Sequence, residues 1–263
     1  MLILKRPWTR QPQTQALLSE LALSLGFDFA WSATRPNNSL LGQVMYTPQT
    51  IPRSVFSSGI ALAGGYAIVN GVVPSMHTTT WTEIGVAYLD GTNSVTTLSG
   101  RTGGEALILA PAQLSSVCWN VATTNIGGAL PAGITNYVVT RIGSAYSFWR
   151  NGRLHGTATS AAAPGAYAYL PAVGAQAGTG PNAGTAPLAA TVGISLVLRT
   201  PIGISPGLAL QLSANPWQLF APQQIIIPTA AAASSLPTLS ASTYVPGSLT
   251  STGWRPRVTA EYA

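Results

Sequence analysis

Short runs with β-type composition, separated by turn residues, fill the middle of the chain and leave few folds open to it. Val, Ile, Thr, Tyr and Trp are concentrated in these runs, and Gly, Pro, Asn and Ser stand between them. Many short strands at close spacing are typical of a β-sandwich or barrel, and not of alternating strands and helices. The expected strands are 65–70, 80–89, 94–98, 105–109, 116–123, 136–142, 145–150, 153–159, 166–174 and 189–198.

The clearest turn signal is Asn151-Gly152, which stands between two of these runs. Both central positions of a type I′ turn need a positive φ, which Asn and Gly tolerate best. The pair therefore predicts a two-residue hairpin with Arg150 directly opposite Arg153. Like charges in opposed positions are mildly unfavourable, unless an anion or a partner chain lies beside them.

Charged side chains are scarce. They make up 7% of the 263 residues, against roughly 25% in an ordinary soluble domain. Twelve Lys and Arg against six Asp and Glu leave a net charge of +6. A soluble monomer usually keeps a charged surface, so we expect small and uncharged polar residues, or other chains, to cover much of this one. The arginines are not clustered, so the positive charge does not indicate specific nucleic-acid binding.

The same scarcity argues against an enzyme. Hydrolytic and metal-assisted chemistry relies on Asp, Glu, His, Cys and Lys, and the chain has two Asp, four Glu, two His, one Cys and one Lys. Glu83 and Glu105 are the only candidate pair of catalytic carboxylates, and no closely spaced motif supports them. The sequence also lacks a phosphate-binding loop. We therefore expect no catalytic residue, no metal ligand and no cofactor.

No sequence feature indicates membrane insertion. The longest apolar runs are shorter than the roughly 18–20 residues that a membrane span needs. No apolar segment of a signal peptide follows Lys5 and Arg6. We expect a chain without a membrane span or a secretion signal.

The first 33 residues differ from the middle of the chain. Leucines recur at helical spacing between residues 14 and 25, and Gly26 supplies a helix stop. Before them, prolines flank basic and aromatic residues in 5–12, which indicates an extended segment without a core of its own. We expect residues 1–33 to form an N-terminal arm with a short helix, 34–221 to form the sandwich, and 222–263 to form a C-terminal extension. The N-terminal arm is either a frayed end or a segment that docks on a neighbouring subunit.

Aromatic and basic residues stand together in both terminal segments. Trp and Arg are the residue types most enriched in interface hot spots. The tryptophans in expected strands, Trp81, Trp119 and Trp149, are instead expected in or beside the core, and Trp217 is expected to fix the end of the sandwich. The candidates for contacts between subunits are Arg6, Trp8, Arg10, Trp254, Arg255 and Arg257.

Several segments resemble, in order, parts of laminin-G-like, concanavalin A-like jelly rolls. Residues 136–141 and 146–152 resemble the paired strands and Asn-Gly hairpin, 172–175 the strand that follows, 192–199 the last core strand and 204–212 the short closing helix. The resemblance covers about residues 50–220 and implies an all-β, concanavalin A-like (laminin-G-like) β-sandwich jelly roll with N- and C-terminal extensions. Many such relatives bind Ca²⁺ through carboxylates on rim loops. Because the acidic residues of this chain are dispersed, no metal site is carried over.

A narrower resemblance concerns residues 212–222, Leu-Ser-Ala-Asn-Pro-Trp-Gln-Leu-Phe-Ala-Pro. This segment is similar to the closing segment of jelly-roll proteins of tailed bacteriophages and prophages, and 6–12 and 254–258 are of the same kind. The resemblance implies a virion structural protein, as a head decoration or a tail component. Such a protein would dock on other virion proteins through its terminal arms. We expect a homo-oligomer in the virion, and a trimer would suit either location.

The alternative is a carbohydrate-binding module for receptor recognition on a tail or head fibre. In that case the outer rim, including 175–188, would bind a host surface glycan. A glycan-cleaving enzyme is a third hypothesis, and it would depend on Glu83 and Glu105.

Overall fold

The computed structural model describes only part of the chain. The described residues are 2–6, 18–33, 40–41, 43, 45–46, 53–56, 59–62, 67–69, 73–89, 96–100, 105–110, 113–118, 122–128, 130–164, 171–174, 176–177, 184–185 and 193–227. Residues Lys5–Gln224 group into one compact unit, and Met1–Leu4 group with Ile225–Ala263 into a second.

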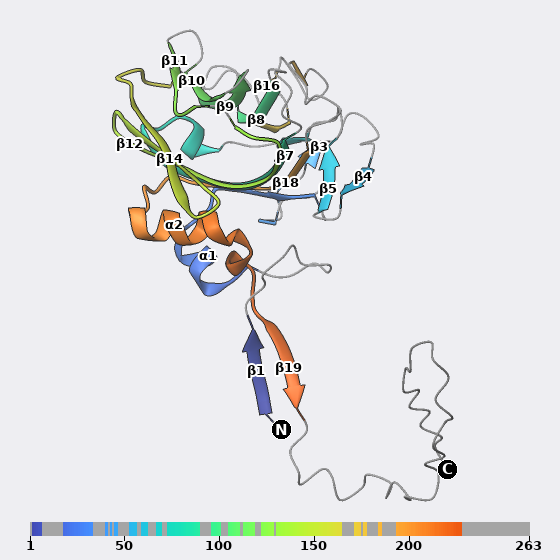
Figure 1. Cartoon of the computed structure of the whole chain (residues 1–263). Helices are drawn as coiled ribbons and strands as arrows, with labels where there is room; N and C mark the ends of the chain where they lie inside the picture. Colours follow the sequence, from blue (N-terminus) through green and yellow to red (C-terminus); the bar gives the residue numbers. More distant parts are fainter. Residues whose placement is uncertain are drawn as a thin grey trace, which may run out of the picture. The chain divides into compact units, whose positions relative to one another are not determined.

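Two antiparallel sheets form the body of the larger unit (Figure 1). The seven-stranded sheet has the order β11 (Ala122–Asn125), β10 (Gln113–Cys118), β9 (Glu105–Ala110), β8 (Thr96–Gly100), β15 (Ala172–Val173), β6 (Ala67–Val69), β3 (Met45–Tyr46). The six-stranded sheet has the order β14 (Arg153–Thr159), β13 (Ala145–Arg150), β12 (Gly133–Ile142), β7 (Thr80–Leu89), β18 (Gly193–Thr200), β2 (Phe29–Ser32). The expected all-β, jelly-roll β-sandwich is confirmed.

The remaining elements are short. Three two-stranded sheets pair β1 (Leu2–Arg6) with β19 (Gln223–Ile227), β4 (Arg53–Phe56) with β5 (Gly59–Leu62), and β16 (Gln176–Ala177) with β17 (Gly184–Thr185). The helices are α1 (Glu20–Ser24), η1 (Pro74–Met76), α2 (Pro206–Ala214) and η2 (Pro216–Leu219).

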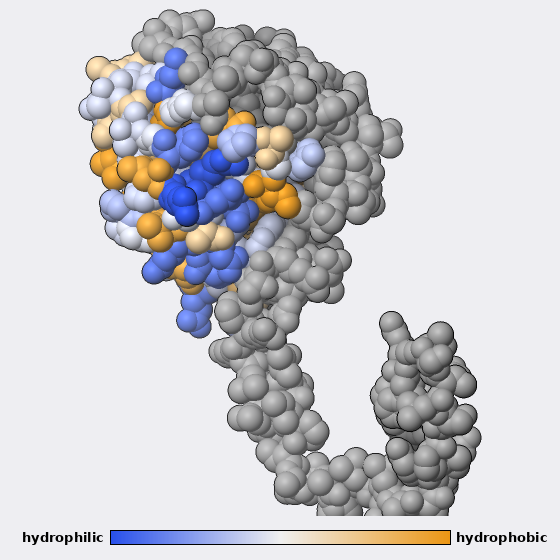
Figure 2. Space-filling model, in the orientation of Figure 1, coloured by the Kyte–Doolittle hydropathy of each residue, from blue (hydrophilic) through white to orange (hydrophobic). Residues whose placement is uncertain are grey.

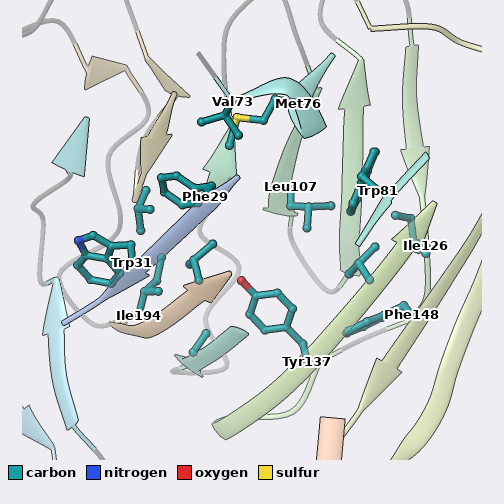
Figure 3. Close-up of a cluster of buried hydrophobic side chains, with 14 of the residues drawn as sticks. Phe29, Trp31, Val73, Met76, Trp81, Leu107, Ile126, Tyr137, Phe148 and Ile194 are labelled. Atoms are coloured by element: carbon teal, nitrogen blue, oxygen red, sulfur yellow. The ribbon is translucent and has the colours of Figure 1, made fainter. Parts of the chain in front are cut away.

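The first hydrophobic cluster lies on the inner face of the six-stranded sheet. Figure 3 shows its large side chains, which include Trp81, Tyr137 and Phe148 of that sheet and Leu107 of the opposite one. Successive residues of a strand point to opposite faces, so these side chains come from alternate positions of β7, β12 and β13. Burial of this apolar surface holds the two sheets together.

A second cluster covers the outer face of the six-stranded sheet. Helices α1 and α2 lie against this face (Figure 1) and contribute Ala22, Ala209 and Leu212, while β18 contributes Leu196 and Leu198. Because both faces of the sheet are covered, all eight residues of β18 are buried. The sandwich therefore has a third, helical layer that the strand pattern alone did not predict.

The expected boundary of the N-terminal arm at 33/34 needs correction. Phe29 and Trp31 of β2 are completely buried, and β2 pairs with β18 at the edge of the six-stranded sheet. Ala22 of α1 is also buried, and the Ser19 amide donates to the Leu219 carbonyl at 2.8 Å. Residues 18–33 therefore belong to the sandwich, because their apolar side chains complete its core.

Local signals placed the end of α1 and one hairpin correctly, and missed the start of α1 and another hairpin. Gly26, with φ +58°, follows the end of α1 as expected, but the helix begins only after the Ser19 cap, and Leu18, expected in it, forms a β-bridge with Phe220. The run 116–123, expected as one strand, is instead a reversal, since β10 pairs antiparallel with β11 and places Cys118 opposite Ala122. Both halves of that run have β-type composition, so composition did not separate them.

Candidate functional site

An ion pair lies on the inner face of the six-stranded sheet. The antiparallel register places Glu83 of β7 opposite Arg199 of β18. Arg199 Nη1 lies 3.1 Å from Glu83 Oε2, and neither side chain has any solvent exposure. The guanidinium also stacks 3.9 Å from the ring centroid of Trp81, and its Nη2 donates to the Ser75 carbonyl at 3.2 Å. This arrangement satisfies a charge that would otherwise be costly inside a protein.

Glu83 also connects the two sheets. The Ser99 hydroxyl, on β8 of the seven-stranded sheet, donates to Glu83 Oε2. The Tyr137 hydroxyl donates to Glu83 Oε1 at 3.0 Å from the neighbouring strand β12. Gly85 stands opposite Tyr137 in the register, and a Cβ there would lie 2.4 Å from the Tyr137 ring. The absence of a side chain at Gly85 therefore lets the ring reach this carboxylate. Burial raises the pKa of Glu83, although Arg199 and the two hydroxyls oppose this shift.

Asp28, which directly precedes β2, connects the start of that strand to η1. Its carboxylate accepts from the Ser75 amide at 2.6 Å and from the Ser75 hydroxyl at 2.7 Å. Since the Ser75 carbonyl accepts from Arg199, Asp28 and Glu83 belong to one polar cluster. The cluster, defined as Asp28, Ser75, Glu83, Ser99, Tyr137 and Arg199, holds strands and η1 together inside the sandwich.

Replacing Asp28 with asparagine is expected to alter how stability depends on pH. Burial raises the pKa of Asp28 from its ordinary value of 3.8, more than the hydrogen bonds from Ser75 lower it. The folded state then binds the proton more tightly than the unfolded chain, so this group's contribution to stability falls as the pH rises from about 4 through the raised pKa.

Urea unfolding from about pH 3.5 to about pH 7 measures this effect. As the pH rises over this window, the free energy of unfolding of Asp28→Asn should increase relative to that of the natural chain, because asparagine does not titrate. A difference that stays constant with pH would contradict the assignment.

A basic hairpin joins β13 to the edge strand β14 of the same sheet. Asn151 has φ +46° and Gly152 has φ +75°, which confirms the expected two-residue turn. The register places Arg150 directly opposite Arg153, as expected. We call residues Arg150, Asn151, Gly152 and Arg153 the arginine hairpin. Figure 2 shows a strongly hydrophilic patch over the region where Figure 1 draws β14, with hydrophobic residues beside it.

Contacts on both sides fix the turn of the arginine hairpin. The Asn151 amide donates to the Asn136 carbonyl at 2.9 Å, and the Asn136 amide donates to Asn151 Oδ1 at 2.8 Å. The Gly152 amide donates to the Ser213 hydroxyl of α2 at 3.2 Å. The turn is thus attached to β12 on one side and to α2 on the other.

Five of the six residues proposed for subunit contacts lie outside the described residues. Arg6 ends β1, and nothing is described of its side chain. Trp8, Arg10, Trp254, Arg255 and Arg257 lie outside the described residues, as do most of 175–188 and the whole of 228–263. The structure therefore brings none of these candidates together, and they remain predictions.

The other singled-out residues have defined places. Trp81 is completely buried and Trp217 nearly so, as expected, and Trp149 is partly buried against the outer cluster. Glu83, one of the two candidate catalytic carboxylates, is enclosed in the polar cluster, while Glu105 lies in β9 of the other sheet. Sequence reasoning did not pair Glu83 with Arg199, although both stand at inner positions of apolar strands.

The described residues contain neither a metal-binding cluster nor a membrane-spanning helix. Across the portion of the chain that the structure describes, no group of three or more His, Cys, Asp and Glu could hold a metal ion. Within the same portion, the helices are too short to span a bilayer.

Comparison with known proteins gives fold likeness only. No family model matches the chain, and no curated protein matches it. A carbohydrate-binding CBM40 domain of the Ruminococcus gnavus IT-sialidase, solved bound to α2,3-sialyllactose, is 13% identical with a TM-score of 0.42, over 53% of this chain and 85% of that one. Trypanosoma rangeli sialidase is 14% identical with a TM-score of 0.46, over 71% of this chain and 32% of that one.

The binding domain of botulinum neurotoxin DC, solved with rat synaptotagmin II, is similar at the same level. It is 9% identical with a TM-score of 0.47, over 65% of this chain and 46% of that one. This chain thus spans about a third of the sialidase and about half of the toxin domain.

Proposed function

We propose that the chain is a non-enzymatic structural protein of a tailed-phage virion, a head decoration or a tail component. It docks on neighbouring virion subunits through its two terminal segments. The observation that carries the proposal is the pairing of β1 with β19, which joins the N-terminal and C-terminal segments in one two-stranded sheet. Segments that are far apart in the sequence can then act together as one attachment element.

The sandwich supports this division of roles. Its six-stranded sheet is covered on the inner face by the opposite sheet and on the outer face by α1 and α2. The central strands of that sheet are therefore enclosed, and β18 is buried along its whole length. The terminal segments, by contrast, carry Trp8, Trp254 and several arginines, which are the residue types that anchor interfaces.

Symmetric assembly suits such terminal segments. Ordering an extended segment costs roughly 1–2 kcal/mol per residue in backbone entropy. Burial of apolar surface on a neighbour offsets this at about 25 cal/mol per Å². Aromatic residues bury the most area each, and a closed homo-oligomer repeats the same contact in every copy.

A deletion tests the proposal. Removing 228–263 takes away the segment that follows β19 and leaves every described element in place. We expect this variant to unfold at the same temperature as the full chain and to be absent from purified particles. Normal incorporation would contradict docking through the C-terminal segment. A deletion of 1–25 is unsuitable, because it removes α1 and the buried Ala22 from the sandwich.

A second candidate function is carbohydrate binding for receptor recognition. The arginine hairpin favours it, because it presents two cations at the edge of the sheet without an acidic partner among the described residues. A binding role at this edge is compatible with attachment through the terminal segments, since the two would use different parts of the chain.

A further inference from the structure

We propose that the arginine hairpin binds the carboxylate or sulfate group of an acidic saccharide. The proposal rests on the second candidate function and names the ligand class that this function would recognise. Three features of the described residues support it: two arginines without a carboxylate partner, their opposed positions and a turn held by hydrogen bonds.

The arginines of the hairpin differ from the buried arginines of the same sheet. Arg199 pairs with Glu83, and Arg141 donates to the carbonyls of Gly143 and Ala162. Arg150 makes one side-chain hydrogen bond, from Nε to the Thr135 hydroxyl at 3.2 Å. Among the described residues, no carboxylate lies within 4 Å of either hairpin arginine. Their Nη groups are therefore available to a ligand.

The opposed positions suit a single anion. Directly opposite residues of an antiparallel pair stand about 4.5–5.5 Å apart at Cα, so both side chains can converge on one group. A guanidinium offers several N–H donors in a planar fork that matches a carboxylate or sulfate in bidentate fashion. An anion held by both would also relieve the repulsion between the two like charges.

The site is partly organised before a ligand arrives. Contacts with Asn136 and Ser213 hold the turn, and Thr135, itself buried, holds Arg150 through its Nε. Partial burial lowers the pKa of Arg150, because desolvation disfavours its charge. A fixed and partly dehydrated donor loses less entropy and less hydration on binding an anion.

The number of cations favours a saccharide over a nucleic acid. A nucleic acid engages a stripe of cations along its phosphates and aromatic side chains for its bases, whereas the hairpin offers two cations on one face of the sheet. The exposed Leu154 stands at the next strand position and points to the opposite face. A sugar ring with one acidic substituent presents a single anion, which two opposed arginines can hold.

Binding of the full-length chain to defined polysaccharides tests the proposal. Isothermal titration would use a sulfated chain (heparin), a carboxylated chain (polygalacturonate) and a neutral chain (dextran). We expect binding to at least one acidic polysaccharide and none to dextran. The double variant Arg150→Gln, Arg153→Gln should lose at least tenfold in affinity with an unchanged unfolding temperature.

The double variant Arg150→Lys, Arg153→Lys is the matched control, because it keeps the net charge and loses the planar fork. We expect it to bind at least threefold more weakly than the natural chain. Full affinity in the lysine variant would overturn the proposal in favour of unspecific attraction to a cationic protein. Equal competition by free sulfate or acetate at the same concentration of anionic groups would overturn the saccharide assignment.

The outcomes separate this proposal from the function on which it rests. Saccharide binding that persists in the glutamine variant would refute the hairpin site and keep carbohydrate binding. Absence of binding to all three polysaccharides would refute both.

Discussion

Replacing Glu83 with alanine is expected to lower the free energy of unfolding by about 3–5 kcal/mol, the usual effect of removing one partner of a buried ion pair. The carboxylate accepts from Arg199, from Ser99 and from Tyr137, and it has no solvent exposure. Its removal leaves the Arg199 charge without its counter-ion and leaves two hydroxyl donors without an acceptor. It also removes a connection between the two sheets.

Urea unfolding measures this effect, with Glu20→Ala as the control. Glu20 is an exposed acidic residue in the first turn of α1, so its loss should lower the free energy of unfolding by about 0.3–1 kcal/mol. The double variant Glu83→Met, Arg199→Met should recover at least half of the loss, because no charge then remains buried. An effect of Glu83→Ala as small as that of Glu20→Ala would show that the cluster does not stabilise the sandwich.

Replacing Gly85 with alanine is expected to lower the free energy of unfolding by about 3 kcal/mol. Overpacking contributes roughly 1–3 kcal/mol, and the loss of one hydrogen bond contributes about 1 kcal/mol. A Cβ at this position would lie 2.4 Å from the Tyr137 ring, and Tyr137 is almost fully buried. The ring would have to move, and its hydroxyl would lose Glu83. A fixed core therefore imposes glycine in the middle of a long strand.

Gly207→Ala is the matched control for this prediction. Nothing lies within 4 Å of a Cβ at Gly207, which is in helix α2, so alanine there should be neutral or stabilise by up to about 1 kcal/mol. Thermal unfolding of both variants makes the comparison. Equal unfolding temperatures for Gly85→Ala and the natural chain would contradict the packing described around Tyr137.

Strands bounded by clear turn residues could be predicted from the sequence. The expected ranges 80–89, 145–150 and 153–159 coincide with β7, β13 and β14. Asn151-Gly152 fixed both the turn and the register that opposes the two arginines. These features depend on neighbours in the sequence, which is why the local pattern was sufficient.

Features that depend on distant pairing could not be predicted in this way. Glu83 and Arg199 are 116 residues apart in the sequence, and only the order of β7 and β18 in the sheet brings them together. The place of 18–33 in the sandwich is a similar case, because α1 and β2 are buried against residues near 196–220. A short leucine-rich segment at the start of a chain gives no sign of which surface will cover it.

The two candidate sites, the arginine hairpin and the terminal segments, also differ in how far the sequence could predict them. The arginine hairpin was expected as a pair of opposed like charges, and the structure adds that the described residues supply neither arginine with a carboxylate. The terminal residues proposed for docking were chosen for their type and their place outside the strand pattern. Their role depends on contacts with other chains, which no single sequence specifies.

Molar mass in solution tests most directly whether the terminal segments of this chain dock on other subunits. Sedimentation equilibrium of the full-length chain should give a small integer multiple of the chain mass, and the variant lacking 228–263 should give the mass of one chain. A full-length chain that sediments as a single copy across micromolar concentrations would contradict the claim.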